Sequence, residues 1–161
     1  MKRYFFMAGG SLVGLALMAT LALWIAEPNA ASAHCQVPCG IYDDQARINR
    51  LHEDATTIAK AIDNIKQLAA SHDAKAFNQA TRWINTKEAH ASHIIEVVSQ
   101  YFLTQKVKPV SAGADGYDAY LKKLADHHAV MVAAMKTKQN VDPVFAQRLE
   151  QAIDALANHY K

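Results

Sequence analysis

The chain has 161 residues, of which 51% are hydrophobic and 20% are charged, and its formal net charge is +2. So small a net charge argues against a nucleic-acid-binding protein, which usually carries an excess of basic residues. The length suits one domain with a single core, and two cysteines are too few for a disulfide-rich scaffold.

Residues 1–33 have the pattern of a leader peptide. Lys2 and Arg3 form a positive start, an almost unbroken apolar run follows from 4 to 26, and residues 31–33 are Ala-Ser-Ala. An Ala-x-Ala triplet behind an apolar run is a leader-peptidase site. We therefore predict cleavage after residue 33 by a signal peptidase or maturation protease, and export to the periplasm or exterior. The run is also long enough to span a bilayer, so a retained leader would tether the protein to a membrane.

Residues 34–42, His-Cys-Gln-Val-Pro-Cys-Gly-Ile-Tyr, contain both cysteines. Cleavage before His34 would free its α-amino group. That amine, the next amide nitrogen and the thiolates of Cys35 and Cys39 can then surround one metal ion, and the His34 imidazole can reach an axial position. Two nitrogen and two sulfur donors in a plane suit nickel or copper, whereas zinc prefers a tetrahedron. The segment therefore predicts a metal-binding hook.

Residues 43–161 predict an all-α fold. Apolar residues recur at steps of three and four in four stretches, about 43–69, 74–103, 117–138 and 143–160, and no stretch alternates as a β-strand does. Stripes of similar length joined mostly by short turns predict an antiparallel up-and-down four-helix bundle.

Each expected helix has an apolar stripe that should face the core. The first two stripes are Ile48, Leu51, Ala55, Ile58, Ile62, Ile65 and Ala69, then Phe77, Ala80, Ile84, Ala91, Ile94, Val98 and Tyr101. The last two are Tyr117, Leu121, Leu124, His128, Met131 and Met135, then Phe145, Leu149, Ile153, Leu156 and Tyr160.

Histidines of the second and third stretches raise the question of a second metal site. They are His90, His93, His127 and His128. A di-iron bundle needs Glu-x-x-His pairs on two helices, and the chain has no such pair. Solvated or hydrogen-bonded histidines are the simpler interpretation. A solvated face is likewise simpler than an anion-attracting rim for Arg47, Arg50 and Lys60.

The pattern His-Cys-x-x-Pro-Cys-Gly-x-Tyr at a processed N-terminus resembles the nickel hook of nickel-containing superoxide dismutases. Its fixed positions are His34, Cys35, Pro38, Cys39, Gly40 and Tyr42. The resemblance implies one nickel ion per subunit, with His34, Cys35 and Cys39 as ligands and Tyr42 ordering water or substrate. It also implies disproportionation of superoxide to O2 and hydrogen peroxide through a Ni(II)/Ni(III) cycle, in a homohexamer of four-helix bundles.

One departure from the family concerns the support of the axial histidine. Better-known members carry a glutamate early in the first helix and an arginine on the second helix that steady it. Here Asn49 stands at the first position, Glu53 lies one turn further on, and Arg82 is the nearest arginine on the second stretch. The departure leaves the nickel donors untouched.

Two alternatives stay open. Cys35 and Cys39 could form a small-loop disulfide in an oxidising compartment, although that would explain neither His34 at the cut nor Tyr42. A non-catalytic exported bundle could use the hook to sequester or deliver nickel or copper. The domains that we predict are a leader at 1–33, a hook at 34–42 and a four-helix bundle at 43–161, with a membrane contacted only through the leader.

Overall fold

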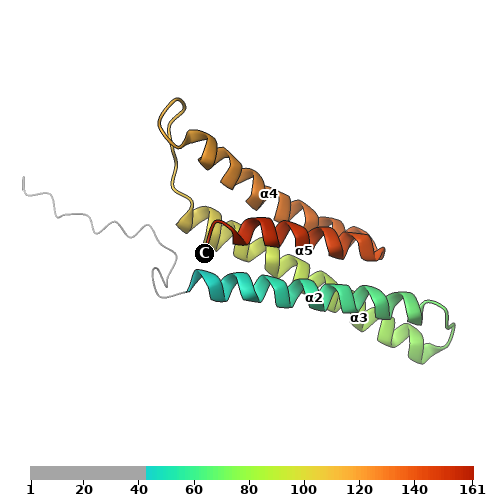
Figure 1. The fold of residues 1–161 in the computed structure, drawn as a ribbon. Helices are drawn as coiled ribbons and strands as arrows, with labels where there is room; N and C mark the ends of the chain where they lie inside the picture. Colours follow the sequence, from blue (N-terminus) through green and yellow to red (C-terminus); the bar gives the residue numbers. More distant parts are fainter. Residues whose placement is uncertain (1–42) are drawn as a thin grey trace, which may run out of the picture. The chain divides into compact units, whose positions relative to one another are not determined.

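The computed structural model describes residues 43–161, so the leader and the hook lie outside the described residues. Its elements are α2 (Asp44–Leu68), α3 (Ala74–Glu96), the π-helix η1 (Val97–Lys106), α4 (Tyr117–Gln139) and α5 (Pro143–Ala157) (Figure 1). Consecutive helices contact each other, and α2 also contacts α5, which closes the bundle. The described part of the chain is all-helical, and the predicted all-α four-helix bundle is confirmed.

Aspartate side chains cap the first turns of three helices. Asp43, Asp73 and Asp142 each accept a hydrogen bond from a backbone N–H two or three residues further on, at 2.8–2.9 Å. These bonds satisfy N–H groups that have no partner within the helix. Pro143 takes the first position of α5, where its missing N–H costs nothing. The starts predicted for these three helices, at about residues 43, 74 and 143, are therefore confirmed.

The core follows the predicted stripes closely in α2 and α5. Its fully or nearly fully buried members include Ile48, Leu51, Ile58, Ile62, Leu149, Ile153 and Leu156. Burying each such side chain contributes about 1.5–3 kcal/mol relative to leaving it exposed. The periodicity of these two helices thus identified the buried faces.

The stripe predicted for α4 is wrong. Leu121 and Met135 are 44% and 37% exposed, whereas the buried residues of α4 are His127, Val130, Ala134 and Thr137. The first three buried positions of α4 are each shifted by one residue along the chain from the predicted ones. Because α4 has apolar residues on both faces, its period alone could not choose between them, and packing against α3 and α5 decided.

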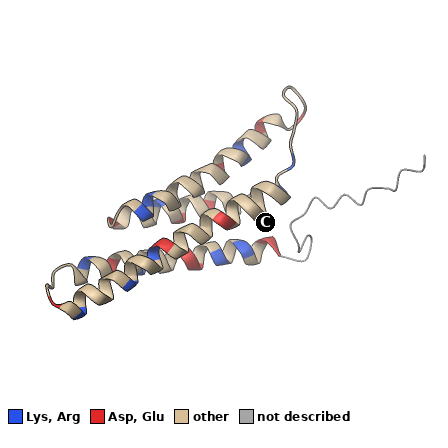
Figure 2. Cartoon of the chain, turned by 180° about the vertical axis from the view of Figure 1, so that it is seen from behind, with Lys and Arg blue, Asp and Glu red and all other residues tan. Residues whose placement is uncertain are grey.

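The first turns of α3 also differ from the prediction. Phe77 is 75% exposed and Ile84 is 41% exposed. The end of α4 lies against Lys87, whose Nζ donates to the carbonyl of Thr137 at 2.6 Å. The turns of α3 before Lys87 therefore extend past the end of α4 and have α2 beside them, as Figures 1 and 2 show.

The other end of α4 likewise extends past α5. His127 meets Tyr160, which follows the end of α5, so the turns of α4 before His127 have no part of α5 beside them. Figure 1 shows this end of α4 leaning away from the other helices. Tyr117, Tyr120 and Leu124 are accordingly only half-buried.

The α-helix predicted to reach Leu103 instead changes to a π-helix after Glu96. In a π-helix the hydrogen bonds join residues five apart rather than four. Two side chains follow the same step, since Thr104 donates to the carbonyl of Ser99 at 2.7 Å and Gln105 to that of Gln100 at 3.1 Å. The altered helix turns Tyr101 and Phe102 both inward, and both are buried.

Charged side chains of both signs are spread along the helices (Figure 2). Arg50, one of the basic residues considered above, pairs with Glu53 at 3.0 Å on the exposed side of α2. This supports the interpretation of a solvated charged face. None of the helices between residues 43 and 161 is long and apolar enough to cross a bilayer.

Candidate functional site

The predicted site residues His34, Cys35, Cys39 and Tyr42 lie outside the described residues. The described chain begins at Asp43, directly after Tyr42. Only Asp43 separates Tyr42 from Asp44 along the chain. The surroundings of Asp44 are therefore the part of the bundle nearest to the hook along the chain.

Asp44 is held by two side chains of η1. The Tyr101 hydroxyl donates to its Oδ1 atom at 2.5 Å, and the Lys106 Nζ lies 2.9 Å from the same oxygen. In an α-helix, residues five apart point about 140° away from each other. The five-residue step of the π-helix instead brings Tyr101 and Lys106 onto one face. We name Asp44, Tyr101 and Lys106 the anchor cluster.

Two residues of the anchor cluster, Tyr101 and Lys106, have raised pKa values. Burial, followed by the hydrogen bond to Asp44, raises the pKa of the Tyr101 phenol. The hydrogen bond to Asp44 raises the pKa of Lys106. Arg47 adds a second positive charge, with its guanidinium carbon 6.0 Å from the centre of the Tyr101 ring. The cluster therefore combines a neutral phenol with the ion pair of Lys106 and Asp44, beside the start of α2.

A second buried group lies behind the anchor cluster. The Phe102 ring contacts the Tyr160 ring at 4.4 Å between centroids, and the Tyr160 oxygen lies 2.7 Å from His127 Nε2. His127 Nδ1 is 2.6 Å from the carbonyl oxygen of Lys123. Because a carbonyl only accepts, Nδ1 carries the proton and Nε2 accepts from the Tyr160 hydroxyl. Burial lowers the pKa of His127 and raises that of Tyr160.

Two of the histidines considered above as metal ligands instead share one carboxylate. His90 Nδ1 and His93 Nδ1 lie 2.6 Å from Oδ1 and Oδ2 of Asp54, which is 1% exposed. Both imidazoles therefore donate to a buried acceptor on α2. The simpler interpretation of hydrogen-bonded histidines is confirmed for this pair and for His127, whereas His128 is exposed. Sequence reasoning missed Asp54, because its partners lie on another helix.

The three residues of the family departure lie on the helix surface. Asn49 is exposed and accepts a hydrogen bond from the Gln45 side chain at 2.9 Å, and Glu53 pairs with Arg50. Arg82 is exposed on α3. Within residues 43–161, the anchor cluster is the polar arrangement closest in sequence to the hook. Sequence reasoning missed the anchor cluster because the pattern of apolar residues does not predict a π-helix.

The sequence was compared with models of known protein families. The family model of nickel-containing superoxide dismutase matches residues 29–161, a span that includes the whole hook and all the described helices. Comparisons with curated proteins and with solved structures gave no match.

Proposed function

The chain belongs to the nickel-containing superoxide dismutase family, and we propose that His34, Cys35 and Cys39 hold its nickel ion. Its activity is the disproportionation of superoxide, and its cofactor is nickel. The observation that carries the assignment is the family match together with the complete hook pattern at residues 34–42.

The donors of the hook fit nickel. After cleavage His34 offers an amine and an imidazole, and Cys35 and Cys39 offer two thiolates. Nitrogen and thiolate donors in one plane suit a nickel ion. When bound, the ion supplies a one-electron couple between the +3 and +2 states, through which one superoxide becomes O2 and another, with two protons, becomes hydrogen peroxide. The two thiols bind as thiolates and must therefore lose their protons.

The anchor cluster supports a role for the adjoining bundle end. Asp44, tied to Tyr101 and Lys106, holds the chain two residues after Tyr42. We propose that this fixes the direction in which the hook leaves the bundle and lets the Tyr42 phenol order water or substrate.

Processing, location and assembly are further proposals. Cleavage after Ala33, by a signal peptidase or a maturation protease, is needed to free the amine of His34, and the apolar leader supports export to the periplasm or exterior. Exposed apolar side chains support self-association. They are Phe77, Ile84, Leu121, Met135 and Val141. The resemblance to the family implies that the assembly is a homohexamer.

Intact mass, metal analysis and a superoxide assay on the native protein test the proposal. We expect a chain that begins at His34, one nickel ion per chain, and turnover that disappears when nickel is removed. An active protein that begins upstream of His34, or that works without nickel, would contradict the assignment. Bound nickel without turnover would identify a protein that sequesters or delivers the metal.

A further inference from the structure

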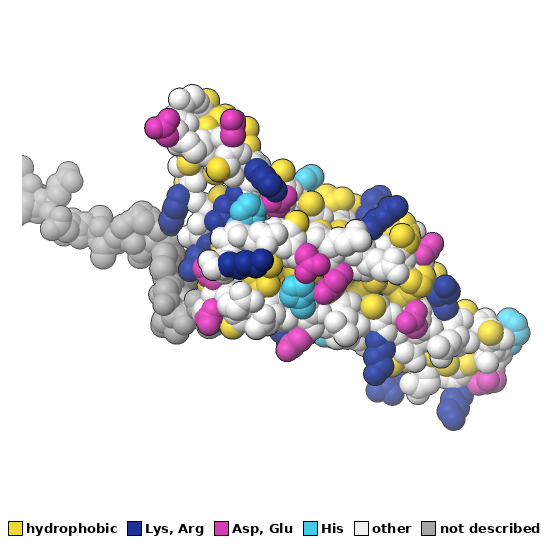
Figure 3. Space-filling model, viewed as in Figure 1, with side chains coloured by type: hydrophobic (Ala, Val, Ile, Leu, Met, Phe, Trp, Pro, Cys, Tyr) yellow, Lys and Arg dark blue, Asp and Glu magenta, His cyan; other side chains and the backbone are white. Residues whose placement is uncertain are grey.

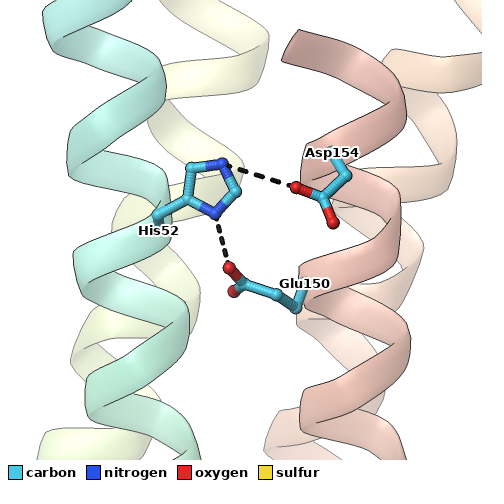
Figure 4. Close-up of side chains that lie close together, drawn as sticks. All are labelled: His52, Glu150 and Asp154. Carbon is cyan, nitrogen blue, oxygen red and sulfur yellow. Dashed lines mark hydrogen bonds and ion pairs between the residues drawn. The ribbon is translucent and has the colours of Figure 1, made fainter.

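A second group of metal-ligating side chains lies on the bundle, distinct from the hook. His52 on α2 faces Glu150 and Asp154 on α5, and one ligand atom of each lies within 4.8 Å of the others. Figure 4 shows the imidazole facing both carboxylates, with one ring nitrogen toward each. Its Nδ1 is 2.6 Å from Glu150 Oε1, and its Nε2 is 3.9 Å from Asp154 Oδ1.

The core holds the backbone of these three residues in place. His52 follows the buried Leu51, and Glu150 and Asp154 directly follow the buried Leu149 and Ile153. Glu150 and Asp154 are four residues apart and so share one face of α5. Since α2 packs against α5, the two backbones cannot move apart without opening the core.

Solvent reaches the group from outside. The side chain of His52 is 29% exposed, and those of Glu150 and Asp154 are 43% and 68% exposed. Figure 3 shows acidic side chains next to a histidine on this face of the bundle. An ion can therefore enter without any movement of the helices.

The two distances assign different roles to the two carboxylates. At 2.6 Å, Glu150 is a hydrogen-bond acceptor for the Nδ1 proton, which leaves the lone pair of the imidazole on Nε2. At 3.9 Å, Asp154 is too far from Nε2 for a hydrogen bond. Two ligands of a tetrahedral ion with bonds of about 2.0–2.1 Å lie about 3.3 Å apart. A small rotation of Asp154 closes that difference.

We propose that His52 Nε2 and Asp154 bind a divalent first-row transition-metal ion, with Glu150 as the residue that positions the imidazole. A metal-bound histidine usually donates its other N–H to a carboxylate, as His52 does to Glu150. Imidazole favours zinc, nickel or copper over magnesium and calcium. In the described part of the chain, Glu150 and Asp154 both form their ion pairs with His52. A divalent cation bound there would offset the negative charge of these two carboxylates.

The test uses the native protein with its one nickel ion per chain, so that the hook is already occupied. The protein is dialysed against zinc at neutral pH, and nickel and zinc per chain are measured by mass spectrometry. We expect one zinc ion per chain beyond the nickel, a zinc-dependent rise in Tm, and unchanged superoxide turnover. The rise in Tm follows because the ion binds the folded bundle, in which α2 and α5 are side by side.

Three variants and a control locate the zinc ion. His52→Gln and Asp154→Asn should lose it, and Glu150→Gln should weaken its binding by about 10- to 100-fold. His128→Gln, which removes an exposed histidine of α4, should bind zinc as the unaltered chain does. No zinc beyond the hook, or equal zinc binding by the His52→Gln and His128→Gln proteins, would overturn the inference. Because nickel content and turnover are measured in parallel, a failure of the hook assignment would be seen separately.

Discussion

The Tyr101 hydroxyl donates a hydrogen bond to the Asp44 carboxylate at 2.5 Å, although 57 positions separate the two residues. The bond joins the π-helix η1 to the first turn of α2. The same carboxylate oxygen also meets Lys106 at 2.9 Å. The start of α2, which follows the hook in the sequence, is therefore bound to η1 by two side chains.

Tyr101→Phe removes this hydrogen bond and keeps the aromatic ring. A hydrogen bond to a charged group contributes about 1.5–3 kcal/mol, and Lys106 still holds Asp44, so we expect the free energy of unfolding to fall by about 1.5 kcal/mol. Urea denaturation measures the change. Tyr120→Phe, on the half-buried face of α4, is the matched control and should change stability little. Equal effects of the two variants would show that the bond to Asp44 contributes nothing.

Substitutions in the hook should separate nickel binding from turnover. Cys35→Ser or Cys39→Ser replaces a thiolate by a hydroxyl that stays protonated, so we expect loss of both nickel and activity. His34→Gln removes only the imidazole and keeps the amine, so much of the nickel should remain while turnover falls. Metal analysis and a superoxide assay measure both quantities. Full activity in the Cys39→Ser protein would refute the sulfur assignment.

Lys87 caps the C-terminal end of α4 by donating hydrogen bonds to its last carbonyls. Its side chain is 3% exposed and donates to the carbonyls of Thr137 and Lys138 at 2.6 and 2.7 Å. Lys87→Met would leave these helix-end carbonyls without a donor, and we expect a loss of about 2–4 kcal/mol in the free energy of unfolding. Lys60→Met, at an exposed site on α2, serves as the control in the same denaturation experiment. A loss no greater than that of the control would mean that water replaces the ammonium.

Asp54→Asn tests the carboxylate shared by two histidines. An asparagine side chain has one oxygen acceptor, so it can accept from His90 or from His93 but not from both through separate oxygens. We expect a loss of about 1–3 kcal/mol in the free energy of unfolding, because one imidazole N–H is left without its acceptor. Asp63→Asn, an exposed change on the same helix, provides the comparison. Calorimetric Tm values that fall equally would contradict this role.

His127 should make the protein less stable as the solution becomes acidic. Burial lowers its pKa in the folded state, so below the unfolded value of about 6.5 the unfolded chain binds a proton that the folded chain refuses. Stability therefore falls as pH is lowered from about 6.5 toward the pKa of the folded state. His127→Leu removes this component, and its stability should depend less on pH in that window.

Urea midpoints between pH 7 and pH 5 measure the dependence, and the slope is compared rather than the absolute stability, since the variant also loses the bond to Tyr160. The exposed His128→Gln protein is the control and should keep the slope of the unaltered chain. A slope in the His127→Leu protein as steep as in the control would rule out His127 as its source.

The sequence by itself determined the family, the hook pattern, the helical class and the start of each helix. These features are local. A nickel hook is a run of nine residues, an aspartate cap acts on N–H groups two or three positions away, and the stripes of α2 and α5 each have one apolar face. Such patterns can be recognised in sequence because every interacting group lies within one or two helical turns.

Only the tertiary structure decided which face of α4 is buried, where α3 changes to a π-helix, and which polar side chains meet. Leu121 and Val130 are equally apolar, yet packing exposes one and buries the other. Asp54 meets His93 across 39 positions, and His52 meets Glu150 across 98. The physical reason is that these contacts depend on the packing angles and axial offsets of neighbouring helices, which the repeat within a single helix does not specify.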